Sequence, residues 1–347
     1  MELDGDGRYS IDEALKLFEL ELPELGAMAD RVRWQINPAR RVTFVIDRNI
    51  NYTNICTSRC RFCAFYRDIG DEDAYVLGKH EIFERIDEAI GLGATQIMLQ
   101  GGLNPELGIE YFEDLLRSIK SRFDVHIHSL SPPEIVHIAQ ISNISIKETL
   151  SRLKFAGLDS LPGGGAEILD DRFREQISPR KIRSSEWIGV MEEAHRIGMQ
   201  TTATMMFGAG EERRDRMVHL ELIRDLQDKT GGFTAFIPWT YQPMNTALGG
   251  SEVGAVEYLR MLAVSRIFLD NFKNIQASWV TQGLKIAQIA LFFGANDLGS
   301  TMIEENVVKA AGATFRADTL ELVGLINELG LEACQRDTCY TRIIKVW

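Results

Sequence analysis

The stretch RVTFVIDRNINYTNICTSRCRFCAFYR (residues 41–67) joins an apolar, β-type segment to three of the chain's five cysteines. Residues 41–54 predict a β-strand, and Cys56, Cys60 and Cys63 follow it in a predicted loop with the spacing C-x₃-C-x₂-C. A disulfide joins two thiols and a tetrahedral zinc site takes four ligands, so a group of three thiols requires another explanation.

The same order of strand and then helix recurs along the chain. Amphipathic stretches such as 80–93 and 184–198 lie between the strand candidates, several of which are nearly continuous apolar runs, as is typical of a parallel sheet covered by helices. The other strand candidates are 95–102, 124–131, 158–164, 200–208, 232–239, 275–280 and 294–300. Eight such units predict an α/β fold of the (β/α)₈ TIM-barrel type. A doubly wound open sheet is the competing arrangement.

We expect the barrel to occupy residues 41–313. Residues 1–40 are expected to form a helical N-terminal cap, and residues 314–347 a C-terminal helix and tail that close the barrel. Polar segments such as QGG (100–102), PGGGAE (162–167) and NDLGS (296–300) directly follow predicted strands. In a barrel such segments converge on the carboxyl-terminal face, which predicts one shared site that includes the cysteines.

Composition and charge argue against several classes of protein. The chain of 347 residues is 45% hydrophobic, which is ordinary for a globular protein, and its formal net charge of −12 argues against a nucleic-acid partner. No apolar run reaches the ~18 residues of a membrane span, and the acidic N-terminus does not resemble a signal peptide. An odd number of cysteines, three of them clustered, favours a reducing cytoplasm. Cys334 and Cys339 are expected to be free thiols.

Three interpretations of the cysteine group compete. The side chains could be small buried apolar groups, but Arg59 and Arg61 interrupt the run. A zinc site would need a fourth ligand from far away in sequence, and would make the chain a zinc-stabilised α/β binding module without catalysis. A [4Fe–4S] cluster held by three thiolates would leave one iron open for a small molecule, and this interpretation accounts best for the number three.

The motif C-x₃-C-x₂-C, with Phe62 before the last cysteine and a strand before the first, resembles the radical S-adenosylmethionine superfamily. Further blocks, including LQGGLNPELGIEYFEDLL, LDSLPGGGAEIL, GGFTAFIPW and GANDLGSTMIEENVV, are similar to the MqnC-type family of cyclic dehypoxanthinyl futalosine synthases. The similarity runs from about residue 40 to 315. Aminofutalosine synthase and the deazaflavin (F420) radical enzymes are related alternatives. Trp239 and Gln242, in AFIPWTYQPMNT, favour the cyclase.

This resemblance implies an enzyme of the futalosine route to menaquinone with one [4Fe–4S] cluster and S-adenosylmethionine. A 5′-deoxyadenosyl radical would remove hydrogen from C4′ of the sugar of dehypoxanthine futalosine, and the resulting carbon radical would form a C–C bond to the benzoate ring. A low-potential electron donor such as flavodoxin or ferredoxin would reduce the cluster.

The resemblance also suggests roles for individual residues. Cys56, Cys60 and Cys63 would hold the cluster. Phe62, Gln100, Gly101, Gly102 and Glu167 would position S-adenosylmethionine, although a glycine pair after a strand also suits a simple tight turn. Ser129, Asn296 and Thr301 are candidate substrate contacts, and Glu134, Asp297 and Glu211 are candidate proton acceptors. The chain departs from the family at Ala209, where relatives usually carry histidine.

Overall fold

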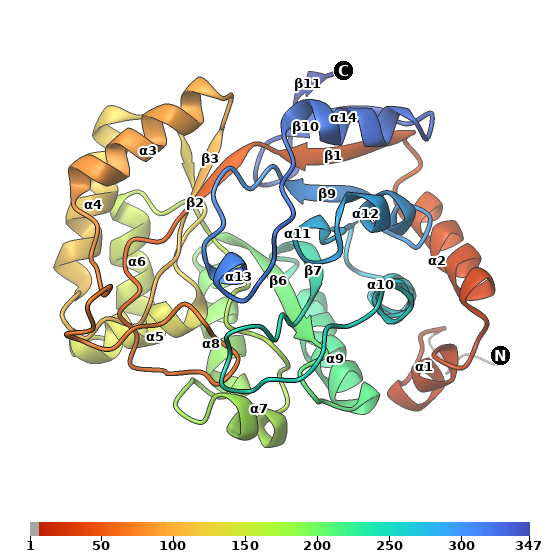
Figure 1. The fold of residues 1–347 in the computed structure, drawn as a ribbon, viewed down its shortest axis with the longest axis horizontal. Helices are drawn as coiled ribbons and strands as arrows, with labels where there is room; N and C mark the ends of the chain where they lie inside the picture. Colours follow the sequence, from red (N-terminus) through yellow and green to blue (C-terminus); the bar gives the residue numbers. More distant parts are fainter. Residues whose placement is uncertain (1–6) are drawn as a thin grey trace.

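The computed structural model of the protein describes residues 7–347, so the first six residues of the expected N-terminal cap lie outside the described part. A ring of parallel strands forms the centre, and helices cover its outside (Figure 1). The strands of the ring are β1 (Arg41–Val45), β2 (Asp47–Ile50), β3 (Gln96–Leu99), β4 (His126–Ile127), β5 (Ser160–Leu161), β6 (Gln200–Phe207), β7 (Phe233–Thr240), β8 (Asn274–Ile275) and β9 (Asp297–Ser300).

The ring closes because short bridges join the sheets. His128 pairs with Ser160 between β4 and β5, and Gln276 pairs with Asp297 between β8 and β9. β9 pairs in parallel with β1, and β1 and β2 are the two halves of one strand interrupted at Ile46. Eight strand positions therefore surround one interior, which confirms the predicted (β/α)₈ barrel.

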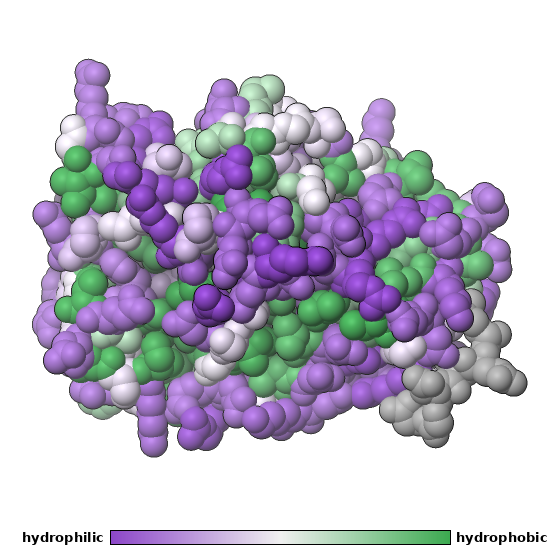
Figure 2. All heavy atoms as spheres, turned by 90° about the horizontal axis from the view of Figure 1, so that it is seen from below, coloured by the Kyte–Doolittle hydropathy of each residue, from purple (hydrophilic) through white to green (hydrophobic). Residues whose placement is uncertain are grey.

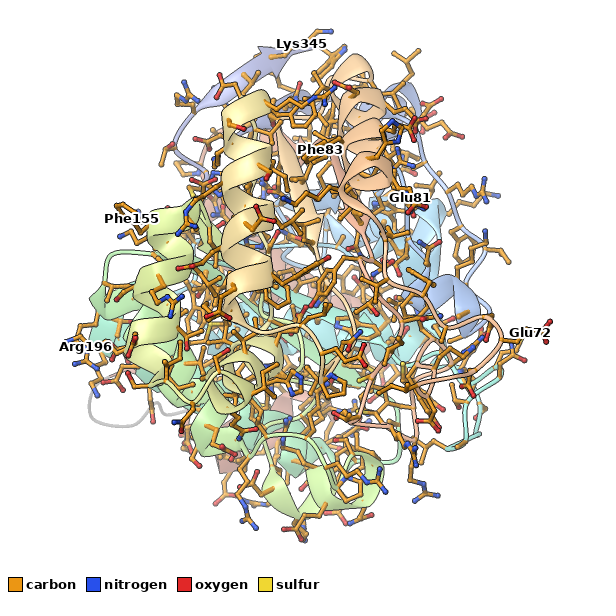
Figure 3. The ribbon with its side chains drawn as sticks, turned by 90° about the vertical axis from the view of Figure 1, so that its left-hand side faces the viewer. Glu72, Glu81, Phe83, Phe155, Arg196 and Lys345 are labelled. Atoms are coloured by element: carbon orange, nitrogen blue, oxygen red, sulfur yellow. The ribbon has the colours of Figure 1, made fainter. Side chains whose placement is uncertain are left out.

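Helices follow the strands as the amphipathic pattern predicted. The helices between strands are α3 (Lys79–Gly91), α4 (Ile109–Arg122), α5 (Pro132–Ile141), α6 (Ile146–Ala156), α7 (Asp171–Ile177), α8 (Ser184–Arg196), α9 (Arg213–Thr230), α10 (Ala255–Phe268), α11 (Trp279–Gln282) and α12 (Leu284–Ala290). In Figure 3, Phe83 lies between α3 and α4 and its ring centroid is 5.7 Å from that of Phe123. Phe155, on the outer face of α6, is 87% exposed. Helices such as α3 and α4 thus bury one stripe and leave the other to solvent, whereas α10 is buried on nearly all sides because α2 packs over it.

The N-terminal segment forms two helices, α1 (Ile11–Leu17) and α2 (Leu22–Ile36), beside α9 and α10 (Figure 1). Ser10 and Glu13 form a capping box that satisfies the first backbone donors of α1. Arg260 on α10 donates to the carbonyl oxygens of Phe18 and Leu20, at 2.9 and 2.6 Å. These bonds hold the connection between the two helices against the barrel wall.

The C-terminal segment adds more to the sheet than the sequence indicated. After α13 (Val307–Ala310) and α14 (Thr319–Asn327), β10 (Glu332–Arg336) pairs in parallel with β1, and β11 (Ile343–Val346) pairs antiparallel with β10. The sequence EACQR of β10 is short and polar, and the sequence predicted no strand there. Arg336, at the end of β10, and Thr338 and Tyr340, in the loop that follows, line the barrel interior.

The outer surface shows no single dominant apolar face in the view of Figure 2. Polar and charged side chains cover much of that face, interspersed with groups of apolar ones. Among the described residues, no helix combines the length and the apolar character needed to cross a membrane.

Candidate active site in the barrel interior

A cavity of about 400 Å³ occupies the barrel interior. Its walls come from the strands and from the loops that follow them, as expected for a barrel enzyme. Cys56, Cys60 and Cys63 lie at the cavity wall, and Arg336 of β10 and Thr338 and Tyr340 of the next loop also line it. The cavity size is within the range of sites for small organic ligands.

The cysteine loop is fixed by its own backbone and by two ion pairs. The N–H of Cys56 donates to the carbonyl of Arg67, and the N–H of Cys63 donates to that of Cys60, both at 3.0 Å. Arg59 pairs with Asp68 and Arg67 pairs with Asp73, each at 2.6 Å. These contacts hold three free thiols on one wall before any metal is bound.

The thiols are suited to iron–sulfur ligation. Burial raises the pKa of Cys60 to about 11 and also raises the pKa of Cys63, so these thiols are protonated at neutral pH unless a metal displaces the proton. Among residues 7–347, no three histidine, cysteine or carboxylate side chains converge on one point as ligands of a single ion do. A [4Fe–4S] cluster makes no such demand, because each thiolate binds a different iron.

The turn after β3 packs tightly against the cysteine loop. A Cβ atom on Gly102 would lie 2.1 Å from the carbonyl oxygen of Ile55, and one on Gly101 would lie 2.7 Å from the ring of Tyr52. The N–H of Gly102 also donates to Thr53 O at 3.0 Å. The glycines are therefore required by this close approach, and together with Gln100 they line the cavity.

Glu134 is buried at the same turn and is fully occupied as an acceptor. Its Oε1 accepts from Tyr52 Oη (2.7 Å) and Gly101 N (3.0 Å), and its Oε2 accepts from Ser131 N (2.7 Å) and Ser131 Oγ (2.5 Å). Although it lines the cavity, Glu134 thus acts as a brace between β2, the glycine turn and α5. This saturation speaks against its expected role as a proton acceptor.

Glu167 lies beside Phe62 and the cysteines, with a cationic partner. Lys181 Nζ donates to Glu167 Oε1 at 2.8 Å and lies 5.3 Å from the Phe62 ring centroid. Burial acts to lower the pKa of Lys181, but Glu167 and Cys60 together outweigh it and the pKa is raised. Glu167 Oε2 is buried without a hydrogen-bond partner, with Arg174 Nη1 3.7 Å away, and the residue adopts φ +41°. An unfilled acceptor in a strained backbone suits a ligand contact.

Two further expected proton acceptors lie outside the cavity because arginines hold them. Asp297 accepts from Arg336 Nε (2.6 Å) and Nη2 (3.1 Å). Glu211 accepts from Arg216 Nε (2.8 Å) and from the N–H of Ala209 (2.8 Å). Neither carboxylate lines the cavity. The loop that carries Ala209 is thus organised around Glu211 without a histidine.

The three expected substrate contacts also face away from the cavity. Ser129 Oγ accepts from Leu99 N at 2.8 Å within the sheet. Asn296 Oδ1 accepts from Arg266 Nη2 at 2.8 Å. Thr301 is buried, and its hydroxyl has no partner. A position next to the end of a strand is therefore insufficient to place a side chain in the cavity, because alternate residues point outward.

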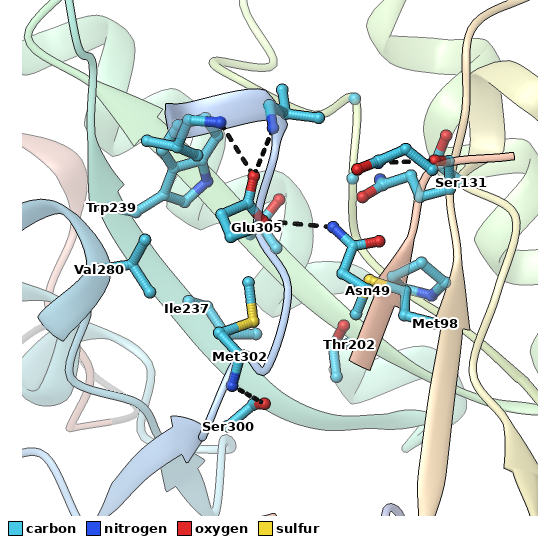
Figure 4. Close-up of a pocket in the computed structure, with 18 of the residues that line it drawn as sticks. Asn49, Met98, Ser131, Thr202, Ile237, Trp239, Val280, Ser300, Met302 and Glu305 are labelled. Carbon is cyan, nitrogen blue, oxygen red and sulfur yellow. Dashed lines mark hydrogen bonds between the residues drawn. The ribbon is translucent and has the colours of Figure 1, made fainter. Parts of the chain in front are cut away.

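Other residues, to which the sequence analysis assigned no role in the site, also line the cavity. Asn49 on β2 and Glu305, before α13, face each other (Figure 4). Apolar and aromatic side chains lie around them; these are Met98, Ile237, Trp239, Trp279, Val280 and Met302. Asp47 lies deeper, accepts from Gln96 Nε2 at 2.6 Å and from Ser300 Oγ, and burial raises its pKa to about 6. Glu305 was not selected from the sequence, because a glutamate at the start of a helix is explained by the helix dipole alone.

A parallel (β/α)₈ barrel with three free thiols on its interior wall defines the class of radical S-adenosylmethionine enzymes. The Radical SAM superfamily profile matches residues 50–223, and the profile of the CofH/MqnC C-terminal region matches residues 230–345. The chain belongs to this superfamily, whose members use a [4Fe–4S] cluster and S-adenosylmethionine, and within it to the MqnC/CofH family.

Full-length relatives divide between two activities. A protein of Halalkalibacterium halodurans named cyclic dehypoxanthine futalosine synthase is 47% identical, with 96% of this chain and 91% of that protein covered. One of the same name from Streptomyces coelicolor is 46% identical, with 97% and 86% covered. A protein of Methanothermobacter thermautotrophicus named 5-amino-6-(D-ribitylamino)uracil–L-tyrosine 4-hydroxyphenyl transferase is 43% identical, with 96% and 94% covered.

Solved structures agree with the fold. Methylornithine synthase (PylB) superposes with a TM-score of 0.74 at 19% identity, covering 93% of this chain and 94% of its own. The hydrogenase maturase HydG from Carboxydothermus hydrogenoformans gives a TM-score of 0.76 at 18% identity, covering 96% and 78%.

Proposed function

We propose that this enzyme converts dehypoxanthine futalosine into cyclic dehypoxanthine futalosine, a step of menaquinone biosynthesis. The observation that carries the proposal is the similarity over nearly the whole chain, at 47% and 46% identity, to two proteins with that name. The cavity supports it, because it offers an apolar, aromatic wall for the benzoate ring and polar groups for the sugar.

The residues present suit the cofactors of the superfamily. Cys56, Cys60 and Cys63 would hold the cluster, and the unfilled Glu167 Oε2 and the backbone of Gly101 and Gly102 would contact S-adenosylmethionine. When bound, the two cofactors supply a 5′-deoxyadenosyl radical that removes a hydrogen atom from the substrate.

The protein's own contribution is to hold the two reacting parts of the substrate together and to exclude water. Trp279 is fixed by a hydrogen bond from its Nε1 to the carbonyl oxygen of Ser300, at 2.9 Å. Together with Trp239 and Ile237 it gives a rigid apolar surface against which an aromatic ring can lie. A fixed ring next to the sugar favours ring closure over side reactions of a carbon radical.

A second candidate function is the transfer of a tyrosine-derived hydroxyphenyl group to 5-amino-6-(D-ribitylamino)uracil. The identity of 43% over 344 residues to the M. thermautotrophicus protein favours it. Both substrate sets combine an aromatic ring with a polyhydroxylated chain, so the same cavity could serve either. Aminofutalosine synthesis, expected as an alternative from the sequence, has no comparable support among the relatives described above.

The two candidates are separated by a substrate assay. The anaerobically reconstituted enzyme, chemically reduced and supplied with S-adenosylmethionine, is incubated with dehypoxanthine futalosine or with the ribitylaminouracil and tyrosine. We expect 5′-deoxyadenosine and a ring-closed product with the first substrate alone. 5′-Deoxyadenosine formed only with the second set would assign the transferase activity instead. The enolpyruvyl-benzoate precursor of aminofutalosine serves as a third arm.

We further propose that a low-potential donor such as flavodoxin or ferredoxin reduces the cluster in the cell, and that the enzyme works in the reducing cytoplasm. The cytoplasmic location is supported by three thiols that must stay reduced to bind iron. The electron donor is tested by replacing the chemical reductant with each purified donor in the substrate assay.

A further inference from the structure

Two polar side chains from distant parts of the chain meet inside the cavity. Asn49 Nδ2, on β2, donates to Glu305 Oε2 at 3.2 Å. Glu305 Oε1 accepts from the N–H groups of Val307 and Val308, at 2.7 and 2.9 Å, at the start of α13. Figure 4 shows these three bonds holding Glu305 in the pocket. The carboxylate is therefore fixed from two sides and cannot turn away from the cavity.

Two oxygen atoms of this pair, Asn49 Oδ1 and Glu305 Oε2, can each accept a further hydrogen bond. Asn49 is 3% exposed, and its Oδ1 is buried without a hydrogen-bond partner. Because the amide nitrogen must face the carboxylate, the amide oxygen has to point elsewhere. Glu305 Oε2 accepts the one bond from Asn49, although a carboxylate oxygen can accept two. A buried acceptor without a donor costs free energy, so the pair is best completed by a ligand that donates hydrogen bonds.

The cationic side chains that line the cavity do not complete this subsite, and its apolar surroundings favour a neutral hydrogen-bond donor. The described cationic residues that line the cavity are Lys181 and Arg336, and each is already paired with another carboxylate, Glu167 and Asp297. Met302, Ile237 and Trp239 surround the pair with apolar surface (Figure 4). Burial raises the pKa of Glu305, and the adjacent Glu304 carboxylate acts in the same direction. Hydroxyl groups satisfy acceptors without bringing a charge into this surrounding.

We infer that Asn49 and Glu305 form the subsite that binds the sugar hydroxyl groups of the substrate. Asn49 Oδ1 and Glu305 Oε2 each accept a hydrogen bond from one of two neighbouring hydroxyls. The identity of the sugar rests on the proposed function, whereas the preference for a polyhydroxylated chain rests on the pair itself. The subsite would fix the sugar, while the aromatic wall fixes the ring.

The test is an affinity measurement on the reconstituted enzyme, read from the fluorescence of Trp239 and Trp279, which line the cavity. Dehypoxanthine futalosine is compared with analogues in which one sugar hydroxyl at a time is replaced by hydrogen. In the wild-type enzyme, at least one analogue should bind about tenfold to a hundredfold more weakly, as for a lost hydrogen bond to a charged group. The Glu305→Gln variant should bind the intact substrate more weakly than wild type by a similar factor. It should bind the substrate and that analogue with nearly equal affinity.

Two further variants keep the inference testable. Asn49→Leu removes the amide but leaves the carboxylate and the cap of α13, and should also reduce discrimination between substrate and analogue. Glu304→Gln is the matched control, because Glu304 lies outside the cavity and pairs with Arg48 at 2.7 Å and Arg85 at 2.5 Å. It should lower the melting temperature and leave the affinity unchanged.

The possible outcomes distinguish an error in the subsite from an error in the cyclase assignment. If wild-type enzyme binds substrate and every deoxy analogue equally, or if Glu305→Gln discriminates as well as wild type, the subsite is wrong and the cyclase assignment stands. If wild-type enzyme does not bind dehypoxanthine futalosine, the cyclase assignment fails. The same comparison with 5-amino-6-(D-ribitylamino)uracil and its deoxy-ribityl analogues then decides whether the pair binds a polyol.

Discussion

The five cysteines of this chain differ in where their side chains lie. Cys56, Cys60 and Cys63 line the cavity, whereas Cys334 is buried in β10 and Cys339 lies in the loop after it. The three cavity thiols sit in a loop whose backbone is already bonded to itself, so iron binding needs little rearrangement. Removing one thiol leaves two ligands, which are too few to hold a [4Fe–4S] cluster that already has one iron without a protein ligand.

We therefore predict that Cys60→Ala lowers bound iron from about four per chain to near zero and abolishes the broad absorbance near ~400 nm. Cys339→Ala is the matched control and should retain both iron and colour. Iron analysis and absorption spectra of anaerobically purified protein provide the measurement. Equal iron content in the two variants would contradict the assignment of the ligands.

The buried carboxylate of Asp47 gives a pH dependence of stability. Its pKa is raised from 3.8 to about 6, with burial as the main cause, so the folded state favours the protonated form. The resulting contribution to stability is present below about pH 4 and is lost as the pH rises through 6. Replacement by asparagine removes this titration.

Between pH 5 and 7, the wild-type protein should therefore lose about 1 kcal/mol more free energy of unfolding than Asp47→Asn. Urea unfolding of both proteins at the two pH values measures the difference. Parallel behaviour of the two proteins over this range would show that Asp47 does not titrate there.

At the scale of elements, β10 and its loop link the C-terminal segment to the barrel. The Arg336–Asp297 pair joins β10 to β9, and its side chains are 3% and 0% exposed. Arg342, in the following turn, pairs with Asp337 at 3.8 Å and is 80% exposed. A buried charge that loses its partner is far more costly than an exposed one.

Arg336→Met should accordingly destabilise the protein by about 3–5 kcal/mol, because Asp297 would remain buried without a counter-charge. Arg342→Met, the matched control, should change the stability by less than ~1 kcal/mol. Chemical unfolding of both variants at pH 7 makes the comparison. Similar small losses in the two would mean that β10 does not anchor the segment.

The sequence predicted the elements of the barrel well where the apolar pattern was continuous. The eight-residue strands β6 and β7 lie within one residue of their predicted bounds, because their apolar runs are long. The strand β10 was missed because the five residues EACQR owe their strand conformation to pairing with β1, not to a pattern of their own.

The residues of the site were also predictable from the sequence only in part. The cysteines and the glycine turn could be found because their spacing itself carries the chemistry. Glu211 follows β6 and Asp297 begins β9, and the arginines that bind these carboxylates come from five and 39 residues away. Partner choice of this kind depends on tertiary packing. Glu305 could be recognised only once β2 and α13 were seen to meet.

At the scale of the whole molecule, the closed barrel brings the thiols, the aromatic wall and the polar pair around one cavity of about 400 Å³. Such an enclosure is what a radical reaction requires, since a carbon radical must meet its partner before solvent or oxygen does. The fold is shared with PylB and HydG at low sequence identity, so the substrate must be decided by the side chains of the cavity.

The most direct test of this account follows one hydrogen atom. Dehypoxanthine futalosine carrying deuterium at C4′ of its sugar is incubated with the reduced enzyme and S-adenosylmethionine, and the products are analysed by mass spectrometry. We predict one deuterium in 5′-deoxyadenosine and a ring-closed product that has lost it. Unlabelled 5′-deoxyadenosine, or labelled 5′-deoxyadenosine without ring closure, would contradict the cyclase assignment.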